Sequence, residues 1–132
     1  MSESPALLLV EDEGLIAIAL EEELAGAGFS VVVAHNGELA LTELRANAER
    51  FRAVITDIRL GAGPDGWMVA HAARELSATM PVIYISGDNA VNWAANGVPE
   101  SVMIPKPFAP AQLVTAVSTL INQADAVRLR AT

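Results

Sequence analysis

The segment Ala6-Leu7-Leu8-Leu9-Val10-Glu11-Asp12 decides the fold class of this chain. Five consecutive apolar residues stop at two acidic ones, which is typical of a central parallel strand buried on both faces. Outward from this segment, apolar runs alternate with helical spacing along all 132 residues. A chain of this length forms one domain with its own core. We therefore expect a single α/β domain over residues 1–132, ordered over about 6–123, with a frayed tail over 124–132.

Further strands and helices follow from the same patterns. The other expected strands are Ser30–Ala34, Phe51–Thr56, Pro81–Ile85 and Ser101–Ile104. The first expected helix has Ile16, Leu20, Leu24 and Ala27 on one face and ends at Gly26 and Gly28. The second is capped by Asn36 and buries Ala40, Leu41, Leu44 and Ala48. The remaining helices are Trp67–Leu76 with Met68, Ala72 and Leu76 in helical spacing, Asp88–Asn96, and Ala109–Gln123 with Leu113, Val117, Leu120 and Ile121 inward.

Strands that alternate with helices predict a parallel sheet, because each right-handed crossover returns the chain to the same end of the sheet. All carboxyl ends of the strands then lie along one edge, where open α/β sheets bind their ligands. The residues expected at that edge are Glu11, Asp12, Asp57, Ser86 and Lys106.

The side chains at this edge indicate a cation and an anion together. Two carboxylates within about 4 Å repel by roughly 4 kcal/mol at an effective dielectric near 20, so the cluster needs a cation. Oxygen ligands without histidine or cysteine favour Mg²⁺. Lys106, the only lysine in the chain, and the Ser86 hydroxyl are suited to a phosphoryl group. Taken one at a time, Glu11, Asp12 and Asp57 are better explained as helix N-caps, but matching groups at four strand ends together favour the site.

Composition excludes several other classes of function. The chain has no cysteine, so disulfides, thiolate zinc sites and cysteine nucleophiles are ruled out. Its net charge of −8 disfavours direct contact with nucleic acid. No run of residues has the length and apolar character of a membrane span, and Met1–Pro5 does not resemble a signal peptide. We expect a cytoplasmic protein.

Four motifs in order resemble the response-regulator receiver family of bacterial two-component signalling. They are Leu7–Glu13 (LLLVEDE), Val54–Asp57 (VITD), Val82–Gly87 (VIYISG) and Ile104–Phe108 (IPKPF). The resemblance covers about residues 6–123. It implies a doubly wound, flavodoxin-like three-layer sandwich with strand order 2-1-3-4-5, as in the single-domain chemotaxis members.

The resemblance also implies a role for each residue at the edge. Asp57 corresponds to the phosphoacceptor, which takes the phosphoryl group of a histidine kinase or a histidine phosphotransfer protein. Asp12 resembles the direct Mg²⁺ ligand and Glu11 its water-mediated neighbour, while Asp57 and the backbone carbonyl of Arg59 complete the protein ligands. Ser86 corresponds to the hydroxyl that moves towards the acyl phosphate, and Lys106 to its ion-pair partner. Such a domain catalyses only its own phosphorylation and dephosphorylation, so it is not an enzyme in the ordinary sense.

The resemblance places signal output on the face formed by residues 88–96, 101–104 and 109–123. Because only a helix and a tail follow Phe108, we expect a stand-alone receiver that acts through a downstream protein or through a dimer formed on phosphorylation. The chain departs from the family pattern at Met103, usually aromatic, and in the long loop Ile58–Gly66. Asp88 either adds a carboxylate near the site or caps the next helix.

The histidines and tryptophans receive structural interpretations. His35 and His71 are expected away from the edge, and Trp67 and Trp93 are expected to pack helices, with Trp93 a candidate anchor for a partner.

Three other functions share parts of this pattern. A flavodoxin-like cofactor module has this fold but needs a phosphate loop after the first strand, where Glu11 stands. A hydrolase with an aspartyl-phosphate intermediate characteristically has a second aspartate where this chain has Arg59. A degenerate receiver would keep the fold as an interaction module without accepting phosphate.

Overall fold

The computed structural model describes residues 5–87 and 92–131. Its five strands are β1 (Ala6–Val10), β2 (Val31–Ala34), β3 (Phe51–Asp57), β4 (Val82–Ser86) and β5 (Val102–Pro105). They form one sheet in the order β2-β1-β3-β4-β5, and every neighbouring pair is parallel. All five predicted strands and their predicted order are confirmed. The bounds differ by a residue or so, and Asp57 belongs to β3 instead of following it.

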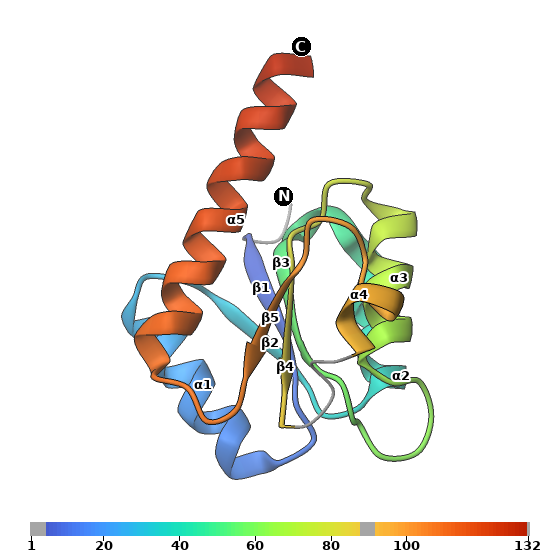
Figure 1. Ribbon diagram of the computed structural model, residues 1–132, viewed down its shortest axis with the longest axis vertical. Coiled ribbons are helices and arrows are strands. Elements are labelled where there is room, and N and C mark those ends of the chain that lie inside the picture. The colour runs from blue at the N-terminus through green and yellow to red at the C-terminus, as the bar shows by residue number, and fades with distance from the viewer. Residues whose placement is uncertain (1–4, 88–91, 132) are drawn as a thin grey trace.

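Helices cover both faces of the sheet, which gives the predicted doubly wound, flavodoxin-like arrangement. They are α1 (Gly14–Gly26), α2 (Gly37–Asn47), α3 (Gly66–Leu76), α4 (Trp93–Asn96) and α5 (Pro110–Ala131), and a 3₁₀ turn, η1 (Ala48–Arg50), follows α2. Figure 1 shows α1 and α5 on one face and α2, α3 and α4 on the other. Each face buries its own apolar cluster against the sheet. The two clusters explain why β1, which contributes to both, is apolar at every position.

The end of α1 corrects one prediction. The residues that α1 buries are Ala17, Leu20 and Leu24, while Ala27 is exposed because the helix stops at Gly26. Gly28 adopts a left-handed φ of 100°, its N–H donates to the Ala25 carbonyl, and the Phe29 N–H donates to the Leu24 carbonyl. This paired closure turns the chain towards β2 before Ala27 can reach the core.

Polar side chains start α2 and α3. Asn36 Oδ1 accepts the Leu39 N–H at 2.8 Å, which confirms the predicted cap. Within α2, Ala40 and Leu44 are buried, and Leu41 is only half-buried. Asp65 Oδ1 likewise accepts the Met68 N–H at 3.0 Å. The core face of α3 is Val69, Ala70 and Ala73, and Met68 and Leu76 are exposed.

The helix predicted over Asp88–Asn96 is described only in part, and α5 is longer than predicted. The described part of α4 is four residues, Trp93–Asn96, and the rest of the predicted helix over Asp88–Asn96 falls largely on residues 88–91, outside the described ranges. The helix α5 buries Leu113, Val117, Leu120 and Ile121 as predicted, but it continues to Ala131 through the segment expected to fray. Among the described residues, no helix is both long enough and apolar enough to span a bilayer.

Candidate functional site

The carboxyl edge of the sheet gathers the residues that the sequence placed there. Glu11, Asp57 and Ser86 are buried, whereas Asp12 is exposed. Carboxylate oxygens of Glu11, Asp12 and Asp57 all lie within 4.8 Å of one another. A hollow of about 490 Å³ opens over them, lined by Asp12, Glu13, Asp57, Arg59, Ser86, Gly87 and Lys106.

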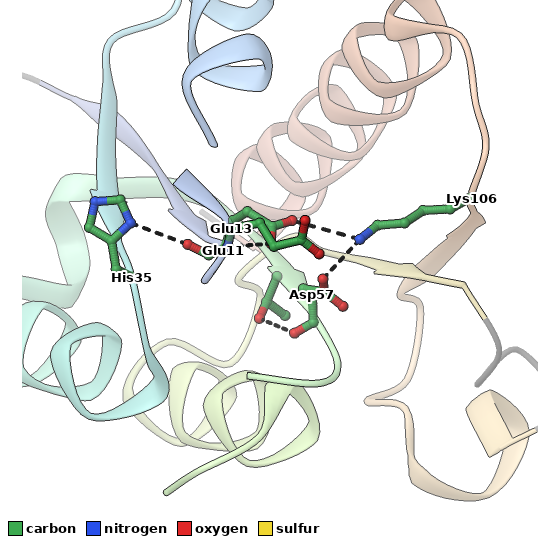
Figure 2. Close-up of polar contacts among 6 residues, drawn as sticks. Glu11, Glu13, His35, Asp57 and Lys106 are labelled. Atoms are coloured by element: carbon green, nitrogen blue, oxygen red, sulfur yellow. Dashed lines mark hydrogen bonds and ion pairs between the residues drawn. The ribbon is translucent and has the colours of Figure 1, made fainter. Parts of the chain in front are cut away.

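Lys106 is the positive charge at the centre of this cluster. Its Nζ lies 3.0 Å from Asp57 Oδ2 and 3.9 Å from Glu11 Oε1, and Figure 2 shows it reaching between the two carboxylates. Burial by itself would lower the pKa of Lys106, but the hydrogen bond and charge of Asp57, together with Glu11 and Glu13, raise the pKa above its usual value. Lys106 is therefore held in its charged form against Asp57.

Glu11 is the most strained group of the cluster electrostatically. Its side chain is 1% exposed; Oε2 accepts the backbone N–H of Glu13 at 3.1 Å, and Oε1 has no hydrogen-bond partner among the described residues. Burial raises the pKa of Glu11 to about 7, with the Glu13 N–H and Lys106 opposing the shift and the charge of Asp57 adding to it. A buried carboxylate oxygen without a donor is short of positive charge.

Local structure fixes the main chain on either side of the Asp57 side chain. Thr56 Oγ1 donates to the Asp57 carbonyl at 2.7 Å, and the Gly66 N–H donates to the Ile58 carbonyl at 2.8 Å. The Cα of Gly66 lies so close that an added Cβ would overlap the carbonyl oxygen of Asp57. The loop 58–65 therefore closes back on the end of β3 and starts α3 directly beside Asp57.

These residues fit a divalent cation. The carboxylates of Glu11, Asp12, Glu13 and Asp57 outnumber the two cationic side chains at the hollow, Lys106 and Arg59. Glu11 Oε1, which accepts no hydrogen bond from the described residues, belongs to the same cluster. Oxygen donors alone, two of them buried, match the preference of Mg²⁺. The exposed side of the cluster, at Asp12, leaves room for water and for a phosphoryl group in the hollow.

Comparison with known proteins decides the family. The family model described as "Response regulator receiver domain" matches residues 7–118. The chain belongs to this family. Receiver domains are signalling domains of two-component systems instead of classical enzymes; they generally bind Mg²⁺ at an acidic pocket, and they interact with histidine kinases and downstream targets.

Solved structures and curated relatives agree with this assignment. The crystal structure of a response regulator receiver protein from Sinorhizobium medicae is 45% identical with a TM-score of 0.88, covering 92% of this chain and 98% of that one. The transcriptional regulatory protein PrrA of Mycobacterium tuberculosis is 31% identical over 91% of this chain and 51% of its own length. CusR of Escherichia coli is 32% identical over 92% and 53% respectively. The chain thus spans about half the length of the curated relatives it matches.

Glu11, Asp12, Asp57 and Lys106 form one cluster, and Ser86 and Arg59 line the hollow beside it. Whether the Arg59 carbonyl is a metal ligand stays a prediction. The role suggested for Asp88 concerns a residue outside the described ranges.

The sequence patterns misplace His35 and assign no role to Glu13 or Gly66. His35 was expected away from the edge, but its Nδ1 lies 3.3 Å from the Glu11 backbone carbonyl (Figure 2) because β2 ends beside β1. Glu13, which lines the hollow and contributes to the field at Lys106, had no role assigned. Its place directly after Asp12 was the available signal. The sequence around Gly66 indicates only a turn, because its close contact with the Asp57 carbonyl depends on the tertiary structure.

Proposed function

We propose that this receiver accepts a phosphoryl group on Asp57, with Mg²⁺ as cofactor, from the phosphohistidine of a histidine kinase or a histidine phosphotransfer protein. The observation that carries the proposal is the contact of Lys106 Nζ with Asp57 Oδ2 at 3.0 Å inside the three-carboxylate cluster. An ammonium at this distance stabilises charge on the phosphoryl oxygens during transfer.

The transfer exchanges one bond for another. A carboxylate oxygen of Asp57 attacks phosphorus, the bond between phosphorus and the donor imidazole nitrogen breaks, and the electron pair returns to the imidazole. Catalysis by the chain consists of positioning and charge neutralisation. Loss of the phosphoryl group to water restores the carboxylate, so the protein turns over only its own modification.

The Mg²⁺ ligands that we propose are Asp12, Asp57, Glu11 through water, and the backbone carbonyl of Arg59. When bound, the ion supplies the positive charge that the phosphoryl oxygens and the three carboxylates share. The Oε1 atom of Glu11, to which no described residue donates a hydrogen bond, and the all-oxygen donor set support this assignment.

We further propose that the chain works as a single domain over residues 1–132 in the cytoplasm. Ser86 would approach the acyl phosphate, and the face of α4, β5 and α5 would contact a downstream protein or a second receiver. The groove of about 1030 Å³ between β5 and α5, lined in part by Val102, Ile104 and Leu120, lies on this face. The net charge of the whole chain, −8, is expected to give it little affinity for nucleic acid.

The test is incubation with Mg²⁺ and acetyl phosphate, or with a phosphorylated histidine kinase, for the native protein and Asp57→Asn. We expect the native protein to gain one label per chain, as an acyl phosphate, and Asp57→Asn to gain none. Omission of Mg²⁺ should reduce labelling of the native protein at least tenfold. Equal labelling of both proteins, or no labelling of either, would contradict the assignment, and the second result would favour a degenerate receiver.

A further inference from the structure

Tyr84 connects the strand that ends at Ser86 to the interior. It stands two residues before Ser86 in β4, so both side chains project from the same face of the sheet. It is fully buried and lies in register between Thr56 of β3 and Met103 of β5. Its ring packs against Trp67 at the start of α3, with centroids 4.7 Å apart and planes tilted by 57°.

The Tyr84 hydroxyl begins a chain of hydrogen bonds towards the surface. The Val98 N–H donates to it at 3.1 Å, Ser101 Oγ donates to the Val98 carbonyl at 2.6 Å, and Trp93 Nε1 donates to Ser101 Oγ at 2.9 Å. Val98 and Ser101 are buried, so losing one of these contacts costs a buried polar group its partner. This series of hydrogen bonds ends at Trp93, which is 38% exposed.

Contacts from α3 hold the same segment in place. His71 Nε2 lies 2.9 Å from the Asn96 carbonyl, and Arg74 donates to the carbonyl of Pro99 at 2.6 Å. The Trp93 ring lies so close to Gly97 that a Cβ there would overlap it. A segment fixed at this many points does not deform continuously, so a displacement at Tyr84 is passed on to Trp93 as a change of arrangement.

We propose that the hydrogen-bonded chain Tyr84–Val98–Ser101–Trp93 couples the phosphorylation site to the surface at α4. The proposal rests on phosphorylation of Asp57 as set out above. When Ser86 moves towards the acyl phosphate, β4 carries Tyr84 with it, the Tyr84–Val98 hydrogen bond is rearranged, and Trp93 changes its environment. Output in this receiver thus depends on a buried tyrosine of β4 and does not require an aromatic side chain at Met103 of β5.

Trp93 itself reports the coupling. The chain has two tryptophans, so Trp67→Phe leaves Trp93 as the single indole and keeps a ring against Tyr84. In this background we compare the parent with Tyr84→Phe, which removes the hydroxyl alone, and with Ser101→Ala, which breaks the far end of the chain. Each sample receives Mg²⁺ and acetyl phosphate, and both Trp93 emission and the label on Asp57 are measured. Asp57→Asn in the same background is the control for reagent effects on emission.

We expect the labelled parent to change its Trp93 emission. Tyr84→Phe and Ser101→Ala should take up the same label within about twofold and lose at least half of the emission change. The inference is overturned if label is present and both variants show the emission change of the parent, or if the labelled parent shows none. Absence of label on the parent overturns the proposed function as well, so the two failures are distinguishable.

Discussion

Glu11 is a carboxylate in an almost completely buried position, and its charged form destabilises the folded protein. Its pKa of about 7, against an ordinary value of 4.5, means that the folded state binds a proton more tightly than the unfolded state. The contribution of the more tightly bound Glu11 proton to the free energy of unfolding is fully present below about pH 4.5 and is lost as the pH rises towards 7. The loss amounts to at most about 3 kcal/mol. A cation at the cluster would offset this loss of stability, because it would neutralise the buried charge of Glu11.

Glu11→Gln should remove this pH dependence. Without divalent cations, we expect the free energy of unfolding of the native protein to fall between pH 5 and 7 relative to that of the variant. At pH 8 the variant should be more stable by about 1–3 kcal/mol, because a neutral amide replaces a buried charge. Urea denaturation in the presence of a chelator, at several pH values, measures the difference.

The exposed Glu22 of α1 supplies the matched control for loss of one negative charge. Glu22→Gln should leave the pH profile of the native protein unchanged. Millimolar Mg²⁺ should stabilise the native protein at pH 8 more than it stabilises Glu11→Gln. Native stability that rises between pH 5 and 7 relative to Glu11→Gln would refute this account of Glu11.

Among the elements, α3 begins in direct contact with the end of β3. Gly66→Ala places a methyl group on the Asp57 carbonyl, so the helix start, the loop 58–65 or the end of β3 must shift. We expect a destabilisation of about 1–3 kcal/mol together with slower labelling of Asp57. Urea denaturation and the time course of labelling by acetyl phosphate measure the two effects.

Gly26 is the control for glycine replacement within a helix. Nothing lies within 4 Å of a Cβ built there, and it is the last residue of α1. Gly26→Ala should change stability by less than about 1 kcal/mol, towards greater stability, and leave labelling unaltered. If Gly66→Ala behaves like Gly26→Ala in both measurements, close packing at Gly66 does not position Asp57.

At the scale of the whole molecule, α5 runs back past the sheet, and its C-terminal end lies at the end of the molecule opposite the site (Figure 1). Asp125 near that end forms an ion pair with Arg52 of β3 at 3.0 Å, with both side chains 44% exposed. Exposed pairs contribute little, and Ile121 is the last buried residue of α5 among the side chains whose burial is described. We therefore expect the end of α5 to add little to the stability of the domain.

A variant that ends at Gln123 should accordingly keep its fold and its phosphorylation. We expect its free energy of unfolding to fall by less than about 1 kcal/mol, with an unchanged rate of labelling at Asp57. Arg52→Ala in the full chain separates the ion pair from the rest of the segment. A loss above about 2 kcal/mol in the shortened variant, with Arg52→Ala unaffected, would mean that the end of α5 packs more tightly than its exposure indicates.

The sequence by itself predicts the strands, the parallel sheet and the grouping of the residues at its carboxyl edge. The apolar run Ala6–Val10, the caps and the alternation of elements determined the strands and the parallel sheet, because these depend on periodicity and on the direction of each crossover. Parallel strands share one carboxyl edge, so the grouping of Glu11, Asp57 and Lys106 followed from topology. The resemblance to receivers supplied the strand order and the chemical roles.

Only the tertiary structure decided what depends on distances between elements remote in the chain. It buried Glu11 with no hydrogen bond to Oε1 from the described residues, set Lys106 between two carboxylates, and pressed Gly66 onto the Asp57 carbonyl. It also turned Ala27 to solvent and joined Tyr84 to Val98. Local patterns record which face of an element is apolar, whereas burial, pKa and hydrogen-bond partners are set by the packing of one element against another.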